Sequence, residues 1–184
     1  MQRRYLLCYL LLTAAGAAVA SCTNDMGVPV YVDVTYQLRC RNDCLGKLEA
    51  PPRRVRGLDD QTDPIIDCFI SVGELTFTAQ QGDEYGIRVD NSNLAGPTPD
   101  RCRVTVSEGA NSFEGSCSGT PPAPPLVPCQ LNILPDPSGA LLGSLLCVDL
   151  PQRLQPSEVR SLEAPGNLPA PQPAAFNLQG CRQL

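Results

Sequence analysis

The feature that most constrains the fold of this chain is a strict alternation of apolar and polar residues in short segments. In residues 28–39 every second residue is apolar, namely Val30, Val32, Val34, Tyr36 and Leu38. A period of two is typical of a β-strand with one buried face. Similar segments follow at residues 66–72, 75–79, 85–89, 102–106, 113–117, 129–133, 141–148 and 175–181. The sequence therefore predicts an all-β chain.

The spacing of these segments predicts the architecture. Gly, Asp, Asn and Pro clusters separate seven to nine short strands, which is typical of an antiparallel β-sandwich. Immunoglobulin-like and jelly-roll topologies both fit, and the strand order is not readable. The single candidate for a helix is Pro156 to Glu163, where Ser157 could cap the first turn. Cysteines flank both proline-rich stretches, 120–125 and 165–173, so we expect one sandwich domain over residues 28–184.

The first 21 residues have the organisation of a secretory signal peptide. Arg3 and Arg4 precede an apolar run from Tyr5 to Leu12 and small apolar residues from Ala14 to Ala20. This run is too short to cross a membrane once its polar ends are excluded. We therefore expect residues 1–21 to be removed on export.

The end of that segment reads Val19-Ala20-Ser21-Cys22 and resembles the lipobox of bacterial lipoproteins. The resemblance implies that Cys22 carries a diacylglyceryl group, that its new amino group is acylated, and that residues 22–27 tether the domain to the membrane. In that family a residue other than aspartate after the cysteine, here Thr23, implies the outer membrane. The alternative is ordinary cleavage after Ala20, which would give a secreted or periplasmic protein.

The cysteine count favours the lipoprotein interpretation. Ordinary cleavage removes Cys8 and leaves nine cysteines, an odd number, whereas lipid attachment also commits Cys22. Eight then remain, which is the even number that a disulfide framework needs: Cys40, Cys44, Cys68, Cys102, Cys117, Cys129, Cys147 and Cys181.

Hairpin geometry predicts two of the disulfides. Facing residues of an antiparallel pair have a constant sum of numbers, and a turn between Gly109 and Ala110 places Cys102 opposite Cys117. A turn centred on Ser138 places Cys129 opposite Cys147 in the same way. The other four cysteines allow three pairings. Among these we expect Cys44 with Cys68 and Cys40 with Cys181.

The sequence contains few candidates for catalysis. It has no histidine, which excludes a Ser-His-Asp triad and a histidine-ligated metal. Four aspartates cluster before a strand, namely Asp59, Asp60, Asp63 and Asp67. Such a loop could bind calcium, but we favour the interpretation that these residues form turns. We therefore expect no catalytic residue, no metal and no cofactor.

The basic residues supply a candidate binding site. Arg53, Arg54 and Arg56 lie in the most basic part of the chain and could hold an anionic ligand, or they could form a solvated loop. Loss of Arg3 and Arg4 leaves 12 basic against 19 acidic residues, a net charge of −7. Such an acidic protein is a poor nucleic-acid binder.

These observations predict a non-catalytic exported lipoprotein of a bacterial envelope. It would be a structural or binding module that presents sandwich loops to a glycan or a protein. The alternative is a hydrolase acting through carboxylates, which would need two of them facing each other across a cleft.

Overall fold

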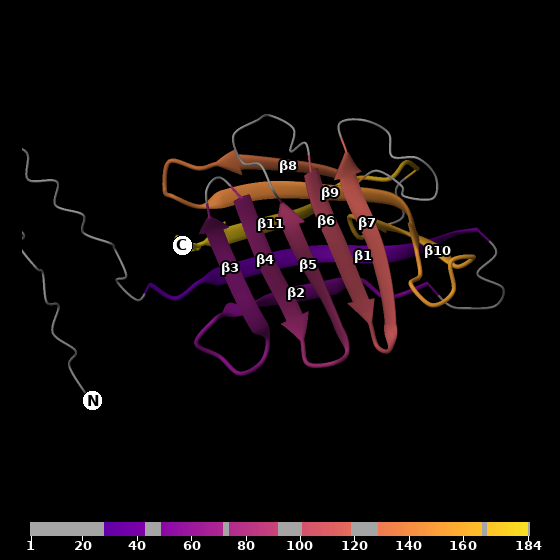
Figure 1. Cartoon of the computed structure of the whole chain (residues 1–184), viewed down its shortest axis with the longest axis horizontal. Helices are drawn as coiled ribbons and strands as arrows, with labels where there is room; N and C mark the ends of the chain where they lie inside the picture. Colours follow the sequence, from indigo (N-terminus) through magenta and orange to yellow (C-terminus); the bar gives the residue numbers. More distant parts are fainter. Residues whose placement is uncertain are drawn as a thin grey trace, which may run out of the picture.

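The structure is a computed structural model that describes residues 28–42, 49–71, 74–91, 101–118, 129–166 and 169–183. The expected signal peptide, Cys22, the tether and Cys44 lie outside these residues. The described residues contain twelve strands and no helix, and the strands form two sheets packed face to face (Figure 1). The all-β, disulfide-stapled sandwich predicted from the alternation is therefore confirmed.

One sheet, sheet A, has β8 at one edge and β2 at the other. Its strands are β1 (Tyr31–Asn42), β2 (Arg53–Leu58), β8 (Cys129–Pro135), β9 (Leu141–Pro151), β10 (Val159–Glu163) and β11 (Ala174–Gln179). All its pairs are antiparallel.

Strands β10 and β11 lie end to end between β1 and β9. The first half of β1 pairs with β11 and its second half with β10, and β9 divides its pairing in the same way. The described residues between the two strands, 164–166 and 169–173, leave the sheet as a proline-rich excursion. The Ala164 N–H donates to the Gln172 carbonyl across 2.7 Å and closes the neck of this excursion.

The other sheet, sheet B, is a meander in which consecutive strands are neighbours. It contains β3 (Ile65–Ser71), β4 (Glu74–Gln81), β5 (Tyr85–Asn91), β6 (Arg101–Glu108) and β7 (Asn111–Ser118), with β12 (Arg182–Gln183) parallel to β3. Its strands cross those of sheet A steeply (Figure 1). This order differs from the Greek-key orders of immunoglobulin-like and jelly-roll sandwiches.

The alternating residues form the core as predicted. Val30, Val32 and Leu38 are fully buried, and their β1 neighbours Asp33 and Arg39 lie on the opposite face, half-buried. Phe77 of sheet B and Phe176 of sheet A place their ring centroids 5.1 Å apart between the sheets. The buried side chains of both sheets belong to one continuous cluster.

The candidate helix at Pro156 to Glu163 is not formed. Residues 159–163 form β10, which exchanges backbone hydrogen bonds with β1 on one side and β9 on the other. Val159 and Leu162, which would share a face of a helix, point to opposite faces of the strand. Pairing on both sides outweighs the weak local preference for a helix.

Three disulfides lie in the described residues. Cys102 is joined to Cys117 and Cys129 to Cys147, the two pairs predicted from hairpin register. Cys68 is joined to Cys181, so the expected pairs Cys44–Cys68 and Cys40–Cys181 are wrong. The physical reason is the short β12, which returns the C-terminus to the edge of β3 beside Cys68. Cys40 is also disulfide-bonded.

Candidate binding surfaces

The three arginines predicted to bind an anion do not form one site. They lie on β2, where successive side chains point to opposite faces of the sheet. Arg54 and Arg56 are exposed on the outer face of sheet A, whereas Arg53 shares the other face with buried Val55. The predicted group is therefore divided, and only Arg54 and Arg56 face solvent together.

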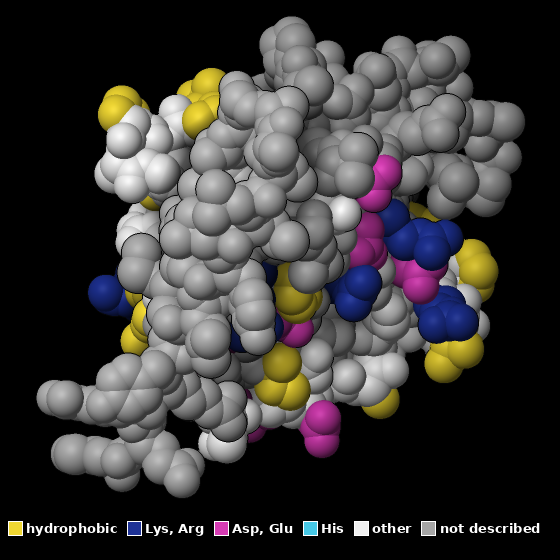
Figure 2. All heavy atoms as spheres, turned by 60° about the vertical axis from the view of Figure 1, so that its left-hand side comes forward, with side chains coloured by type: hydrophobic (Ala, Val, Ile, Leu, Met, Phe, Trp, Pro, Cys, Tyr) yellow, Lys and Arg dark blue, Asp and Glu magenta, His cyan; other side chains and the backbone are white. Residues whose placement is uncertain are grey.

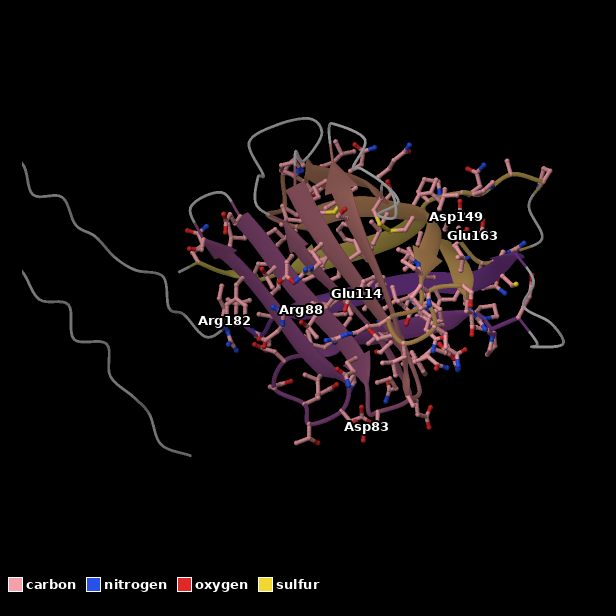
Figure 3. The ribbon with its side chains drawn as sticks, turned by 45° about the vertical axis from the view of Figure 1, so that its right-hand side comes forward. Asp83, Arg88, Glu114, Asp149, Glu163 and Arg182 are labelled. Atoms are coloured by element: carbon pink, nitrogen blue, oxygen red, sulfur yellow. A yellow bond between two sulfur atoms is a disulfide. The ribbon has the colours of Figure 1, made fainter. Side chains whose placement is uncertain are left out.

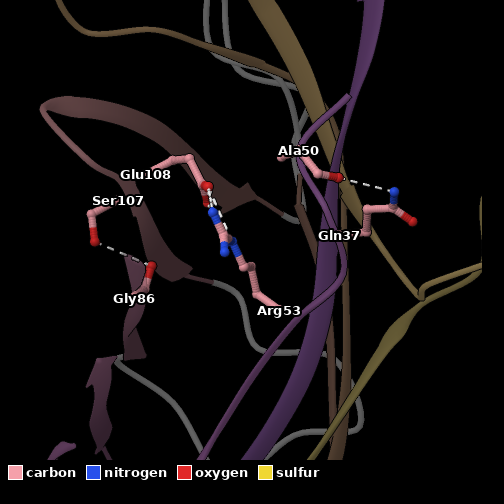
Figure 4. A network of polar contacts seen from close by, with 6 residues as sticks. All are labelled: Gln37, Ala50, Arg53, Gly86, Ser107 and Glu108. Atoms are coloured by element: carbon pink, nitrogen blue, oxygen red, sulfur yellow. Dashed lines mark hydrogen bonds and ion pairs between the residues drawn. The ribbon is translucent and has the colours of Figure 1, made fainter. Parts of the chain in front are cut away.

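Arg53 joins the two sheets. Its guanidinium binds the Glu108 carboxylate of β6 through Nε and Nη2 (Figure 4). Its Cζ also lies 4.5 Å from the ring centroid of Tyr85 on β5. The hydrogen bond to Glu108 holds the pKa of Arg53 above its usual value. Next to this contact, burial raises the pKa of Tyr36, whose hydroxyl has no hydrogen-bond partner. Arg53 is thus a structural link and not an open anion site.

Arg54 and Arg56 flank one carboxylate on the outer face of sheet A. Arg54 makes a two-point contact with Asp33, with Nε–Oδ1 and Nη2–Oδ2 distances of 3.0 and 2.7 Å. Arg56 lies 3.9 Å from the same carboxylate, and its Cζ is 5.7 Å from the Tyr31 ring centroid. The hydrogen bond from Arg54 lowers the pKa of Asp33. This cluster carries one net positive charge, with Arg54 and Arg56 side chains 55% and 60% exposed.

The aspartates considered for calcium hold loops in place. Asp59 accepts a hydrogen bond from the Val30 N–H at 2.9 Å and pairs with Arg182 near the C-terminus. Asp63 accepts from the Gly82 N–H at 3.0 Å and from the Gln81 amide at 2.9 Å. These contacts support the turn interpretation. Among the described residues, no three His, Cys, Asp or Glu side chains gather as a metal site would require.

Opposite charges lie side by side over the visible described surface. On the right of Figure 2, Arg side chains lie next to Asp and Glu side chains. Arg88 contacts Asp90 on β5 in this manner, with Nη2 and Oδ1 2.9 Å apart. Such exposed pairs contribute little to stability. Because opposite charges alternate, few large regions of the surface have a potential of one sign.

One hollow opens on the outer side of sheet A. It has a volume of about 120 Å³ and is lined by Arg39, Cys40, Glu49, Glu163 and residues 169–171 of the proline-rich excursion. Arg39 Nε lies 2.9 Å from Glu163 Oε1, and the Glu163 side chain is only 6% exposed. Figure 3 shows Glu163 at the end of the molecule that also carries Asp149, away from Arg182. The hollow is therefore lined by two carboxylates, and one of them, Glu163, forms an ion pair with Arg39.

A buried ion pair between Glu158 and Arg160 lies between the two sheets. Glu158 Oε1 accepts from both Nε and Nη2 of Arg160, at 3.1 and 2.9 Å, and both side chains are 9% exposed. The Arg160 guanidinium also lies 5.5 Å from the ring centroid of Phe113 on β7. Removing one partner of such a buried pair would leave the other without its counter-charge, which is strongly destabilising.

Sequence patterns alone did not indicate the contact between Arg39 and Glu163. The two residues are 124 positions apart and meet because β10 pairs with the second half of β1. The local feature in the sequence that relates to the hollow is the proline-rich stretch 165–173, because residues 169–171 line one side of it.

Comparisons with protein-family models, with curated proteins and with solved structures give no match for this chain. In the described part of the chain, no helix is long and apolar enough to cross a membrane.

Proposed function

We propose that the protein is a lipid-anchored, non-catalytic module of a bacterial cell envelope, attached to the outer membrane through Cys22. The observation that supports this most is the state of the cysteines. All seven described cysteines are disulfide-bonded. The eight cysteines after Cys22 can complete such a framework among themselves, which leaves Cys22 available for lipid.

The arrangement of charged residues supports a binding or structural role. Asp33, Asp59, Asp63 and Glu108 each accept hydrogen bonds that fix a strand or a loop. A general acid or base needs instead a carboxyl that is available to a substrate. The ligand we propose is a glycan or protein in contact with exposed loops or the outer face of sheet A. If the ligand is anionic, we expect Arg54 and Arg56 to contact it, without Arg53.

The anchor is tested by replacing Cys22. Two or three acyl chains at about 0.8 kcal/mol per buried methylene make attachment effectively stable. We expect wild-type protein to incorporate an alkyne-labelled fatty acid and to enter the detergent phase of a cloud-point extraction. Cys22→Ser should lose the label and give soluble protein or an unprocessed precursor. Cys8→Ser is the matched control and should keep the label, because Cys8 is removed with the leader. Wild-type protein in the aqueous phase would contradict the proposal.

A carboxylate-dependent hydrolase is the second candidate, favoured by the presence of Glu49 and Glu163 in one hollow. An inverting or retaining glycosidase needs two carboxyls about 5–10 Å apart. The test is hydrolysis of a panel of chromogenic glycosides by wild-type protein and by Glu49→Gln. Activity that Glu49→Gln abolishes while the fold is retained would favour this candidate over the first.

A further inference from the structure

The edges of the two sheets differ in how they are protected. An edge strand has backbone groups free to pair with another chain, and proteins usually block it with charge or cover it. The β2 edge carries Arg53, Arg54 and Arg56. The β7 edge is covered by the end of β9, since Gln152 bridges to Phe113 and the Arg153 N–H donates to the Ser112 carbonyl at 2.8 Å. On the other side of sheet B, β12 is only two residues long and pairs with residues 69–70 of β3, while the part of β3 before it carries the charge of Asp67.

Among the residues that the structure describes, the β8 edge has no such protection. Its sequence, Cys-Gln-Leu-Asn-Ile-Leu-Pro, contains no charged residue over seven positions. Strand β9 lies on one side of it, and no strand of the described residues lies on the other. On the outer face Leu134 and its cross-strand neighbour Leu142 are 69% and 42% exposed. In its described part, this net acidic chain thus has a long, uncharged and partly apolar edge.

The register shows which backbone groups of β8 point outward. Cys129 and Cys147 face each other with a Cα–Cα distance of 4.1 Å, which is typical of a non-hydrogen-bonded pair. Asp136, which directly follows β8, donates its N–H to the Ala140 carbonyl at 2.8 Å, so this pair is hydrogen-bonded. The two kinds of pair alternate along the ladder, so the odd-numbered residues of β8 form the non-hydrogen-bonded pairs with β9. Between these points Leu131 and Ile133 therefore direct their N–H and C=O groups away from β9.

We propose that a second copy of this chain pairs with β8 in an antiparallel, two-fold symmetric manner centred on Asn132. In this register Leu131 faces the partner's Ile133, and Ile133 faces the partner's Leu131, so each pair exchanges two backbone hydrogen bonds. Pro135 has no N–H to donate and ends the ladder. The result is one continuous sheet through both copies.

The pattern of charge selects a second copy as the partner. In a two-fold antiparallel pair, the residue on the axis faces itself, so a charged residue there would face its own charge. Asn132 is neutral and can hydrogen-bond its own copy, and Leu134 faces the partner's Gln130. Elsewhere the net acidic surface repels a second copy, whereas this edge adds no repulsion. The proposal does not depend on the lipid anchor or on any ligand.

The first test is a cross-link in the full-length protein. The two copies of residue 132 would form a non-hydrogen-bonded pair with Cα atoms about 4.5 Å apart, within disulfide reach. We expect Asn132→Cys to give a covalent dimer on a non-reducing gel. Asn177→Cys is the matched control, because Asn177 lies on the same outer face but on β11, inside the sheet. No dimer with Asn132→Cys, or an equal yield with both variants, would overturn the proposal.

The second test uses charge at the same position. Asn132→Lys places two like charges on the axis, and Asn132→Asp does the same with the opposite sign. Each variant alone should dimerise at least about tenfold more weakly than wild type in detergent-solubilised full-length protein. Mixing the two variants should restore the dimer, since lysine then faces aspartate. A mixture that dimerises no better than either variant would show that residue 132 does not face its own copy, which contradicts the proposed register.

Discussion

At the scale of single residues, Gly143 illustrates how tightly the two sheets pack. A Cβ at this position would lie 2.0 Å from Cζ of Phe176, whose ring lies against Phe77 in the core. Because the ring has no room to withdraw, Gly143→Ala should lower the free energy of unfolding by about 1–3 kcal/mol. Guanidinium denaturation under non-reducing conditions measures this. Ser144→Ala, the adjacent outward-facing position, is the control and should change it by less than about 0.5 kcal/mol. A Gly143→Ala variant as stable as wild type would contradict the packing.

Asp33 makes a contribution to the stability of the fold that decreases as the pH falls. The hydrogen bond from Arg54 lowers its pKa in the folded state. Its contribution to stability is therefore present above the ordinary carboxyl pKa of 3.8 and is lost as pH falls through the lowered folded value. Arg54→Ala should cause a small loss of stability at pH 7, because the pair is exposed, and a smaller loss near pH 2. Urea denaturation at both pH values tests this, and an equal loss at both would refute it.

At the scale of elements, the disulfides differ in the length of chain that each one closes. Cys68–Cys181 spans 113 residues and attaches β12 to β3, whereas Cys129–Cys147 spans 18 residues within one hairpin. The entropy of loop closure rises with the logarithm of that length, so removing the longer bridge should cost about 1.5 kcal/mol more. Denaturation of the two double-alanine variants gives the comparison. Loss of Cys102–Cys117, which spans 15 residues, should resemble loss of Cys129–Cys147. An equal cost for all three would show that loop length does not govern these bridges.

At the scale of the whole molecule, Arg53 and Glu108 couple the two sheets. The charge-assisted contact joins β2 to β6, and Tyr85 covers one face of the guanidinium. Because both side chains are largely shielded from solvent, with 24% and 18% exposed, the coupling should exceed that of a surface pair. We expect a double-mutant cycle of Arg53→Ala and Glu108→Ala to give about 1–2 kcal/mol of coupling. The exposed pair of Arg88 and Asp90 is the comparison, with an expected coupling of less than about 0.5 kcal/mol. Similar couplings for the two pairs would contradict a special role for Arg53.

The sequence by itself determined the features that depend on local order along the chain. Alternation identified the buried face of β1, and turn positions set the registers that place Cys102 opposite Cys117 and Cys129 opposite Cys147. Strand period and hairpin symmetry act over a few residues, so a single sequence contains them. The leader and the lipobox resemblance are local in the same sense and remain predictions.

Only the tertiary structure decided which distant segments meet. It placed β10 and β11 end to end between β1 and β9, brought Arg39 to Glu163, and paired Cys68 with Cys181 through β12. It also divided Arg53 from Arg54 and Arg56, because three neighbouring arginines on a strand cannot all point to one face. These contacts depend on the packing of two sheets, in which segments far apart in the sequence are selected by shape and hydrogen bonding over the whole core. No local pattern in the chain carries that information.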